Sequence, residues 1–191
     1  MTPAIALSLG LLGGTTLWDP KLNDYQWEVA PRAAYGAQAR ASLGRFGAGL
    51  RVWQSATTQR LGDPGTPSPQ VRTTSLELIG QGRVASVLGT RLLATASAGR
   101  IHLGYHPDHV TLDSPGGPIA VELSPVSTWS AGGGLALERA LAGRWLASAS
   151  VDRQMFALDT AHRNGNTIET RRETFGDWNA RLGVEWLIGR H

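Results

Sequence analysis

Residues 25–43 read YQWEVAPRAAYGAQARASL and alternate in character with a period of two. The odd positions, from Tyr25 to Leu43, carry no charge, whereas the even positions hold every charged residue of the stretch, Glu28, Arg32 and Arg40. Because successive side chains of a strand point to opposite faces, this pattern predicts one long strand with an apolar and a polar face.

The same alternation recurs in seven further stretches, which begin near Ile5, Arg45, Ser75, Arg91, Val121, Trp145 and Asp177. Near Gly99 the apolar and polar positions exchange places, which predicts a bulge. The pattern as a whole therefore predicts an all-β protein of eight long strands.

The predicted connections alternate between short and long. Short ones fall near Leu43-Gly44, Ser86–Thr90 and Ala140–Gly143, and longer polar ones at Asp19–Asn23, Leu61–Thr66, Pro107–Pro118 and Ala161–Arg172. Tight turns at one end and long loops at the other are typical of an eight-stranded antiparallel up-and-down transmembrane β-barrel.

Periodicity alone does not say which face points inward. A soluble lipocalin-like carrier would bury the apolar face, and a membrane barrel would turn it outward. The interior of an eight-stranded barrel barely holds its side chains, and the apolar face carries many large rings. We therefore expect the apolar face to meet lipid, and we keep the soluble carrier as an alternative.

On this assignment, the polar face forms a network of paired charges in the lumen. The lumen residues are predicted to be Glu28, Arg32, Arg40, Arg51, Glu77, Arg83, Asp152, Asp177, Arg181 and Glu185, with Arg45, Arg91, Glu122 and Glu138 on the same face. The lipid-facing aromatic residues are predicted to be Tyr25, Trp27, Tyr35, Phe46, Trp129, Trp145, Trp178 and Trp186.

With these strands, the chain resembles the small eight-stranded outer-membrane proteins, the OmpA-barrel, OmpX and NspA-like group. The final stretch, Gly176–His191, is similar to the closing strand of such barrels but ends in Gly-Arg-His instead of an aromatic residue. The resemblance implies a single transmembrane barrel domain over residues 1–191, in the outer membrane of a Gram-negative bacterium. It further implies a monomer with periplasmic termini and extracellular long loops.

The apolar N-terminus, Ala4–Leu12, is either the core of a signal peptide or a first strand. Because no basic residue precedes it, we expect the strand, and no signal peptide in this chain. The longest apolar runs fall well short of the roughly 20 residues that a membrane-spanning helix needs.

Composition excludes several classes. The absence of cysteine among the 191 residues excludes disulfides, thiolate metal sites and cysteine nucleophiles. The net charge is +3, but the arginines are scattered singly apart from Arg171-Arg172, so we expect no nucleic-acid partner. No cofactor signature occurs, and we expect no cofactor.

Two groups of residues suggest chemistry. His102, His106 and His109, with Asp108 and Asp113, have the ligand types of a metal site, but one loop does not fix three or four ligands, so we expect a polar loop and no metal. Ser97, His102 and Ser114 could serve a lipid A-modifying enzyme of the deacylase or acyltransferase type. No motif of those enzymes is matched, so we assign no catalytic residue.

The leading hypothesis is therefore an outer-membrane barrel with a side-chain-plugged lumen and a structural or surface-interaction role through its loops. The expected partners are outer-membrane lipid and lipopolysaccharide, whose phosphates Arg163, Arg171 and Arg172 could meet, and an extracellular protein. The alternatives are the lipid A-modifying enzyme and a narrow pore.

Overall fold

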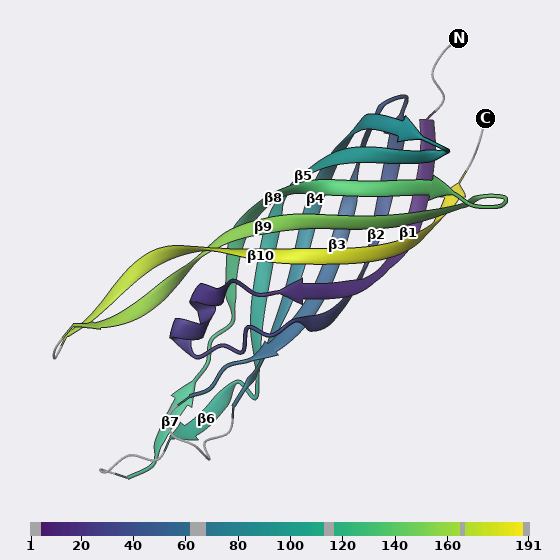
Figure 1. Ribbon diagram of the computed structural model, residues 1–191. Coiled ribbons are helices and arrows are strands. Elements are labelled where there is room, and N and C mark those ends of the chain that lie inside the picture. Colours follow the sequence, from purple (N-terminus) through teal and green to yellow (C-terminus); the bar gives the residue numbers. More distant parts are fainter. Residues whose placement is uncertain (1–4, 62–67, 113–116, 165–166, 189–191) are drawn as a thin grey trace.

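The computed structural model describes residues 5–61, 68–112, 117–164 and 167–188. Within these residues, eight antiparallel strands close into a barrel in the order β1-β10-β9-β8-β5-β4-β3-β2 (Figure 1). Their bounds are β1 (Ile5–Leu17), β2 (Arg32–Leu43), β3 (Phe46–Thr58), β4 (Gln70–Val87), β5 (Thr90–His106), β8 (Val126–Ala140), β9 (Trp145–Asn164) and β10 (Thr167–Ile188). The predicted eight-stranded up-and-down barrel is confirmed.

One end of the barrel, called here the turn end, carries the tight connections. Gly44, Gly89 and Gly143 sit in these turns with φ of +61°, +78° and +70°, a conformation that glycine adopts without strain. β1 begins and β10 ends at the same end (Figure 1). All three connections lie where the sequence predicts short turns.

The opposite end, called here the loop end, extends well beyond the ring of strands (Figure 1). It carries a 3-10 helix, η1 (Pro20–Tyr25), and a separate hairpin of β6 (His109–Leu112) and β7 (Ile119–Glu122). It also carries a ribbon formed by β9 and β10, which stay paired out to Asn164 and Thr167. The prediction of a loop over residues 161–172 is therefore wrong, because cross-strand pairing continues into that segment from both sides.

The described part of the chain contains no helix with the length and apolar character needed to cross a membrane. The barrel strands alternate as predicted, with large apolar side chains such as Leu9, Leu50, Leu78 and Leu182 exposed on the outer face. We call this exposed apolar zone the belt.

Register along β5 differs from the sequence prediction. Pairing runs without interruption past Gly99, which faces Glu77 of β4, so no bulge occurs there. The irregularity lies instead on β4, between Arg83 and Ala85. The exchange of apolar and polar positions at Gly99 has another cause: the surroundings of both faces of the strand change there.

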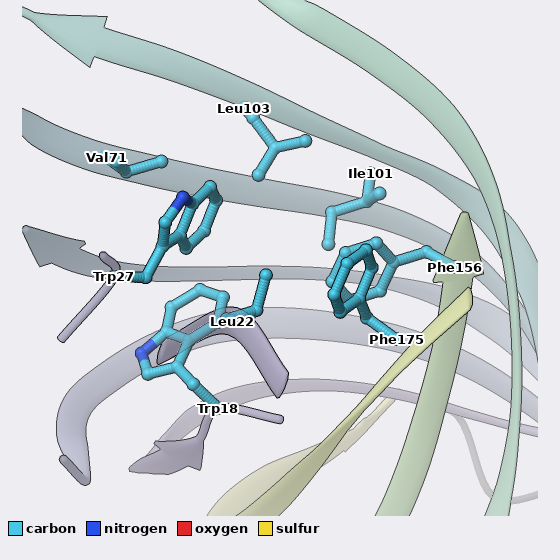
Figure 2. Packing of buried hydrophobic residues seen from close by; sticks show 8 residues of the cluster. All are labelled: Trp18, Leu22, Trp27, Val71, Ile101, Leu103, Phe156 and Phe175. Atoms are coloured by element: carbon cyan, nitrogen blue, oxygen red, sulfur yellow. The ribbon is translucent and has the colours of Figure 1, made fainter. Parts of the chain in front are cut away.

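Beyond Gly99, toward the loop end, the interior becomes apolar and the exterior polar. Ile101 and Leu103 point inward and are buried, whereas Arg100 and His102 are exposed outside. The inward residues belong to a buried cluster, called here the loop-end core, made of Trp18, Leu22, Trp27, Val71, Ile101, Leu103, Phe156 and Phe175 (Figure 2). The outer face therefore suits lipid before Gly99 and water beyond it, although the register of the strand does not change.

Residues 18–31 supply one side of the loop-end core. The side chain of Asp19 accepts a hydrogen bond from the Lys21 amide at 3.0 Å and caps η1, and Pro20 begins the helix. Trp27 pairs with Gln59 in an isolated bridge outside the barrel strands, and β2 begins at Arg32. The prediction of one strand over residues 25–43 is therefore correct only for its second part.

Candidate functional site

The lumen holds two clusters of buried charges. The first, called here the turn-end cluster, is centred on Arg40 of β2. Its Nε donates to Glu185 at 2.9 Å, and Nη1 donates to Gln81 at 2.7 Å and forms an ion pair with Glu138. Glu185 also accepts from Ser8 at 2.8 Å, so five strands meet at one guanidinium and one carboxylate.

The second, called here the central cluster, joins Arg51, Glu77, Asp152 and Arg181. Arg51 Nε donates to Glu77 Oε2 at 2.8 Å, and Arg51 lies 3.5 Å from Asp152, which also pairs with Arg181. Gln154 donates to the other oxygen of Glu77 at 2.6 Å. The cluster thus links β3, β4, β9 and β10 across the barrel.

Trp53 covers the central cluster on the loop side. The guanidinium of Arg181 lies 4.6 Å from its ring centroid, a distance at which a cation is attracted to the ring face. The indole Nε1 donates to Asn179 at 3.1 Å and to Thr16 at 3.2 Å. An aromatic side chain is thus accommodated in the lumen because its one polar atom is bonded.

The space between the two clusters is small. Both clusters border one void of about 30 Å³, enough for about two water molecules. Toward the loop end the loop-end core covers the interior, with Trp18 and Trp27 edge to face at 6.0 Å and Phe156 beside Phe175 (Figure 2).

Two aspartates fasten η1 to the barrel. The amide of Asp19 donates to Asp177 Oδ1 at 2.9 Å, and the amide of Gly176 donates to Asp19 Oδ2 at 2.7 Å. Each carboxylate therefore binds a backbone amide at or next to the other aspartate. These two reciprocal hydrogen bonds are called here the latch. Asp177 lies at the loop-side rim of the lumen and forms the latch rather than an ion pair.

A polar cluster connects the same segment to the ribbon. The hydroxyl of Tyr25 donates to Glu173 at 2.7 Å and lies 3.1 Å from Nε2 of His162, which is 2.9 Å from Glu173. Burial, together with the hydrogen bond and charge of Glu173, raises the pKa of Tyr25 above its ordinary value. The sequence pattern assigns these residues to separate segments, and the fold brings them together.

Of the predicted lumen residues, Arg40, Arg51, Glu77, Asp152, Arg181 and Glu185 lie in the two clusters. Glu28 and Arg32 do not: they pair with each other at the loop end, half exposed. Hydrogen bonds from Thr58 and Arg32 lower the pKa of Glu28. Arg83 lies near the turn end and, within the described residues, joins neither cluster.

Three other residues predicted on the lumen face differ in where they lie. Glu122 is exposed in β7 and Arg45 is exposed in the turn before β3, so neither lies in the lumen. Arg91 reaches Glu138 at 3.3 Å and extends the turn-end cluster. The two corrections have one cause: the alternation of the sequence continues past the ends of the strands.

Six of the predicted lipid-facing aromatic residues are exposed on the outer face: Tyr35, Phe46, Trp129, Trp145, Trp178 and Trp186. Trp145 and Trp186 face each other near the turn end at 4.8 Å. The other two assignments are wrong, since Trp27 is buried in the loop-end core and Tyr25 is partly buried against it. Both precede β2, in a segment that folds inward.

Sequence reasoning missed the uncharged partners in the lumen. Gln38, Gln81, Gln154 and Asn179 all bind cluster residues or Trp53. The signal for them is present, because each occupies an inward position of the same alternation. Neutral amides complete the network of charges and are as much a part of it as the arginines.

The residues proposed for chemistry are dispersed. His102 is exposed on β5 and bonded to Ser127 of β8 at 2.9 Å, whereas Ser97 lies on the inward face. Ser114 and Asp113 lie outside the described residues. His109 pairs with Asp108 at 2.8 Å, and in the described ranges no group of three or more histidine or acidic side chains could hold a metal ion.

Comparison with known proteins addresses the fold. No protein-family model matches the sequence, and no curated protein sequence matches it. Among solved structures, Neisserial surface protein A (NspA) aligns with a TM-score of 0.59 at 8% identity, over 95% of this chain and 96% of that one. The class defined by this likeness is the antiparallel transmembrane β-barrel.

Two further structures agree. The Escherichia coli outer membrane protein W aligns with a TM-score of 0.54 at 13% identity, over 98% of this chain and 100% of that one. A major outer membrane protein from Thermus thermophilus aligns with a TM-score of 0.54 at 9% identity, over 97% and 100% of the two chains. The chain therefore has the fold of small outer-membrane barrels.

Proposed function

We propose that the protein is an integral outer-membrane barrel whose lumen is closed by its own side chains, and that it acts by presenting its loop end to a partner outside the cell. One observation carries the proposal: the outer face is apolar along the belt and becomes polar beyond it, while the interior changes in the opposite sense. A barrel wholly in water would not expose Leu50, Leu78 and Leu182 by half or more of their surface.

The closed lumen argues against a diffusion pore. The guanidinium of Arg40 and the carboxylates of Glu138 and Glu185 meet across the interior, and the loop-end core covers one mouth. Eight strands enclose little space even before side chains are added. Within the described residues, the ribbon, the β6–β7 hairpin and η1 offer surfaces for interaction at the loop end.

The ribbon offers a mixed-charge surface. Arg172 pairs with Asp159 at 3.2 Å and Arg171 with Glu169 at 2.9 Å, all largely exposed. Exposed pairs of this kind contribute little to stability, about 0–1 kcal/mol. Their donors and acceptors are free to exchange partners, so a protein surface of mixed charge is the partner that we expect.

Because the chain has no cysteine, single introduced thiols report location directly. We expect T170C on the ribbon to react with a membrane-impermeant maleimide on intact Gram-negative cells. A142C, in the turn between β8 and β9, should react only after the cells are opened. Equal labelling of the two variants on intact cells would contradict the proposed orientation.

Insertion into the membrane and closure of the lumen need separate measurements. The refolded protein should float with liposomes, migrate differently in semi-native gels before and after heating, and give no conductance steps in planar bilayers. Monodisperse protein without detergent would support the soluble carrier instead. Regular conductance steps would support the narrow pore.

One observation favours a second candidate, a lipid-modifying enzyme. His102 Nδ1 and Ser127 Oγ lie 2.9 Å apart on the exposed outer face, a distance at which a histidine can activate a serine. This candidate predicts a change in the mass of lipid A on expression that S127A and H102A both abolish. An unchanged lipid A spectrum with the unmodified protein would reject it.

A further inference from the structure

Two apolar grooves run along the outer face of the barrel. The first, called here the β9 groove, has a volume of about 600 Å³ and lies over Ala149, Val151 and Ala180, between leucines of β8 and β10. The second, called here the β5 groove, has a similar volume of about 600 Å³ and lies over Gly80, Ala96 and Ala98. Both fall within the belt.

Each groove leads toward an arginine on its loop side. Arg153 follows Val151 on the same face of β9, and Arg100 follows Ala98 on the same face of β5. Two residues along a strand span roughly 7 Å. A cation therefore lies just past the end of each apolar surface.

Each arginine also lies over a tryptophan. The guanidinium carbon of Arg153 is 5.9 Å from the ring centroid of Trp178, and that of Arg100 is 5.5 Å from the centroid of Trp129. Each tryptophan is the direct cross-strand partner of its arginine. The same arrangement therefore occurs twice, on different strand pairs.

Gly176 helps to hold one of the two arginines. A Cβ atom at this position would lie 2.7 Å from Nε of Arg153, so the missing side chain lets the guanidinium rest against β10. Within the described residues, neither Arg100 nor Arg153 pairs with a carboxylate, unlike Arg171 and Arg172 of the ribbon. Their charge is therefore available to a ligand.

The complementary ligand has an apolar chain and an anionic head. An acyl chain fits a groove lined by alanine, glycine and leucine, and the guanidinium fork binds phosphate oxygens in pairs. Tryptophan is favoured at the level of lipid headgroups, where its ring is half in lipid. We propose that each groove binds an acyl chain of a membrane lipid whose phosphate is held by Arg153 or Arg100. This inference rests on the membrane location proposed above.

The test uses the full chain in detergent micelles, with phosphatidic acid as the probe and native mass spectrometry as the readout. Replacing both arginines (R100Q/R153Q) should weaken retention of the lipid by about tenfold or more, the effect of losing charge-assisted hydrogen bonds. Filling the grooves (A96L/A149L) should weaken it as well. The matched control, R139Q, removes an exposed arginine near the turn end of β8 and should leave retention unchanged.

Two further arms separate the lipid from its parts. Diacylglycerol with the same chains should bind weakly and equally to all variants, and inorganic phosphate should not displace phosphatidic acid. Equal retention by R100Q/R153Q and R139Q would overturn the proposal, as would full displacement by inorganic phosphate. Flotation of every variant with liposomes keeps this result apart from the proposed membrane location, because a barrel that fails to float tests the location and not the grooves.

Discussion

Arg51 of β3 and Glu77 of β4 are direct cross-strand partners, and Nε of Arg51 donates to Oε2 of Glu77 at 2.8 Å inside the lumen. Glu77 is 1% exposed, so its charge depends on this partner and on Gln154. A buried charge without a partner is costly, which makes the pair a sensitive test of the lumen network.

Removing one member should therefore cost more than removing both. We expect R51M to lower the free energy of unfolding by roughly 3–5 kcal/mol and the double variant R51M/E77M to lower it by less than the sum of the single changes. Urea unfolding of the refolded barrel measures both. The exposed R139M is the control, and strictly additive costs at Arg51 and Glu77 would show that the two side chains do not interact.

The belt makes a prediction about position along one strand. Leu182 is exposed on the outer face of β10 within the belt, and Thr174 is exposed on the same face beyond it. We expect L182R to destabilise the barrel in lipid by roughly 2–4 kcal/mol, because a charge facing the hydrocarbon loses its hydration. T174R should change stability by about 0.5 kcal/mol or less. A harmless L182R would place Leu182 outside lipid.

The loop-end core should be separable from the barrel wall. Leu22 of η1 is 1% exposed and packs against this core. We expect L22A to cost roughly 2–5 kcal/mol of local stability and to speed amide hydrogen exchange in residues 20–27. The heat-dependent gel mobility of the barrel should be unchanged. I119A, at an exposed position of β7, is the control, and loss of the heat-dependent shift in L22A would mean that the two parts fold as one.

The cluster of Tyr25, His162 and Glu173 predicts an alkaline transition at the loop end. Because the pKa of Tyr25 is raised in the folded chain, the unfolded chain loses this proton first as the pH rises. The contribution of Tyr25 to stability is therefore complete below its ordinary pKa and is lost as the pH rises through the folded value. Phenolate absorbance of the wild type minus that of Y25F should show a higher midpoint in the folded than in the unfolded protein.

E173Q should lower that midpoint, since it removes the carboxylate that accepts a hydrogen bond from the Tyr25 hydroxyl and repels the phenolate. E169Q, which alters an ion pair elsewhere on the ribbon, is the matched control. An equal effect of E169Q and E173Q would assign the shift to the general charge of the ribbon rather than to the contact.

Strand alternation is sufficient to predict the barrel, because a period of two persists in stretches such as Leu7–Leu11 and Leu182–Trp186 whatever surrounds them. It also places Arg51 and Glu185 on the inward face. Alternation gives the wrong interpretation where the surroundings of a strand change from lipid to water. At Gly99 the faces keep their register while their polarity exchanges, and a rule that equates polarity with face interprets this as a bulge.

The loop-end errors have a related origin. Tyr25 and Trp27 continue the alternation of β2, but the capped turn at Asp19-Pro20 directs this segment into the loop-end core. The latch between Asp19 and Asp177 joins residues 158 positions apart. Contacts of that range depend on the closed barrel, and no local pattern of residues reveals them.

The exchange of polarity beyond Gly99 divides β5 into two stretches with different requirements. The belt needs apolar side chains outside and paired charges inside. The loop end instead has polar side chains outside and an apolar core, as in a water-soluble protein. New contacts at the loop end can therefore arise by substitution in the ribbon, the β6–β7 hairpin and η1, while the residues that anchor the chain in the bilayer stay as they are.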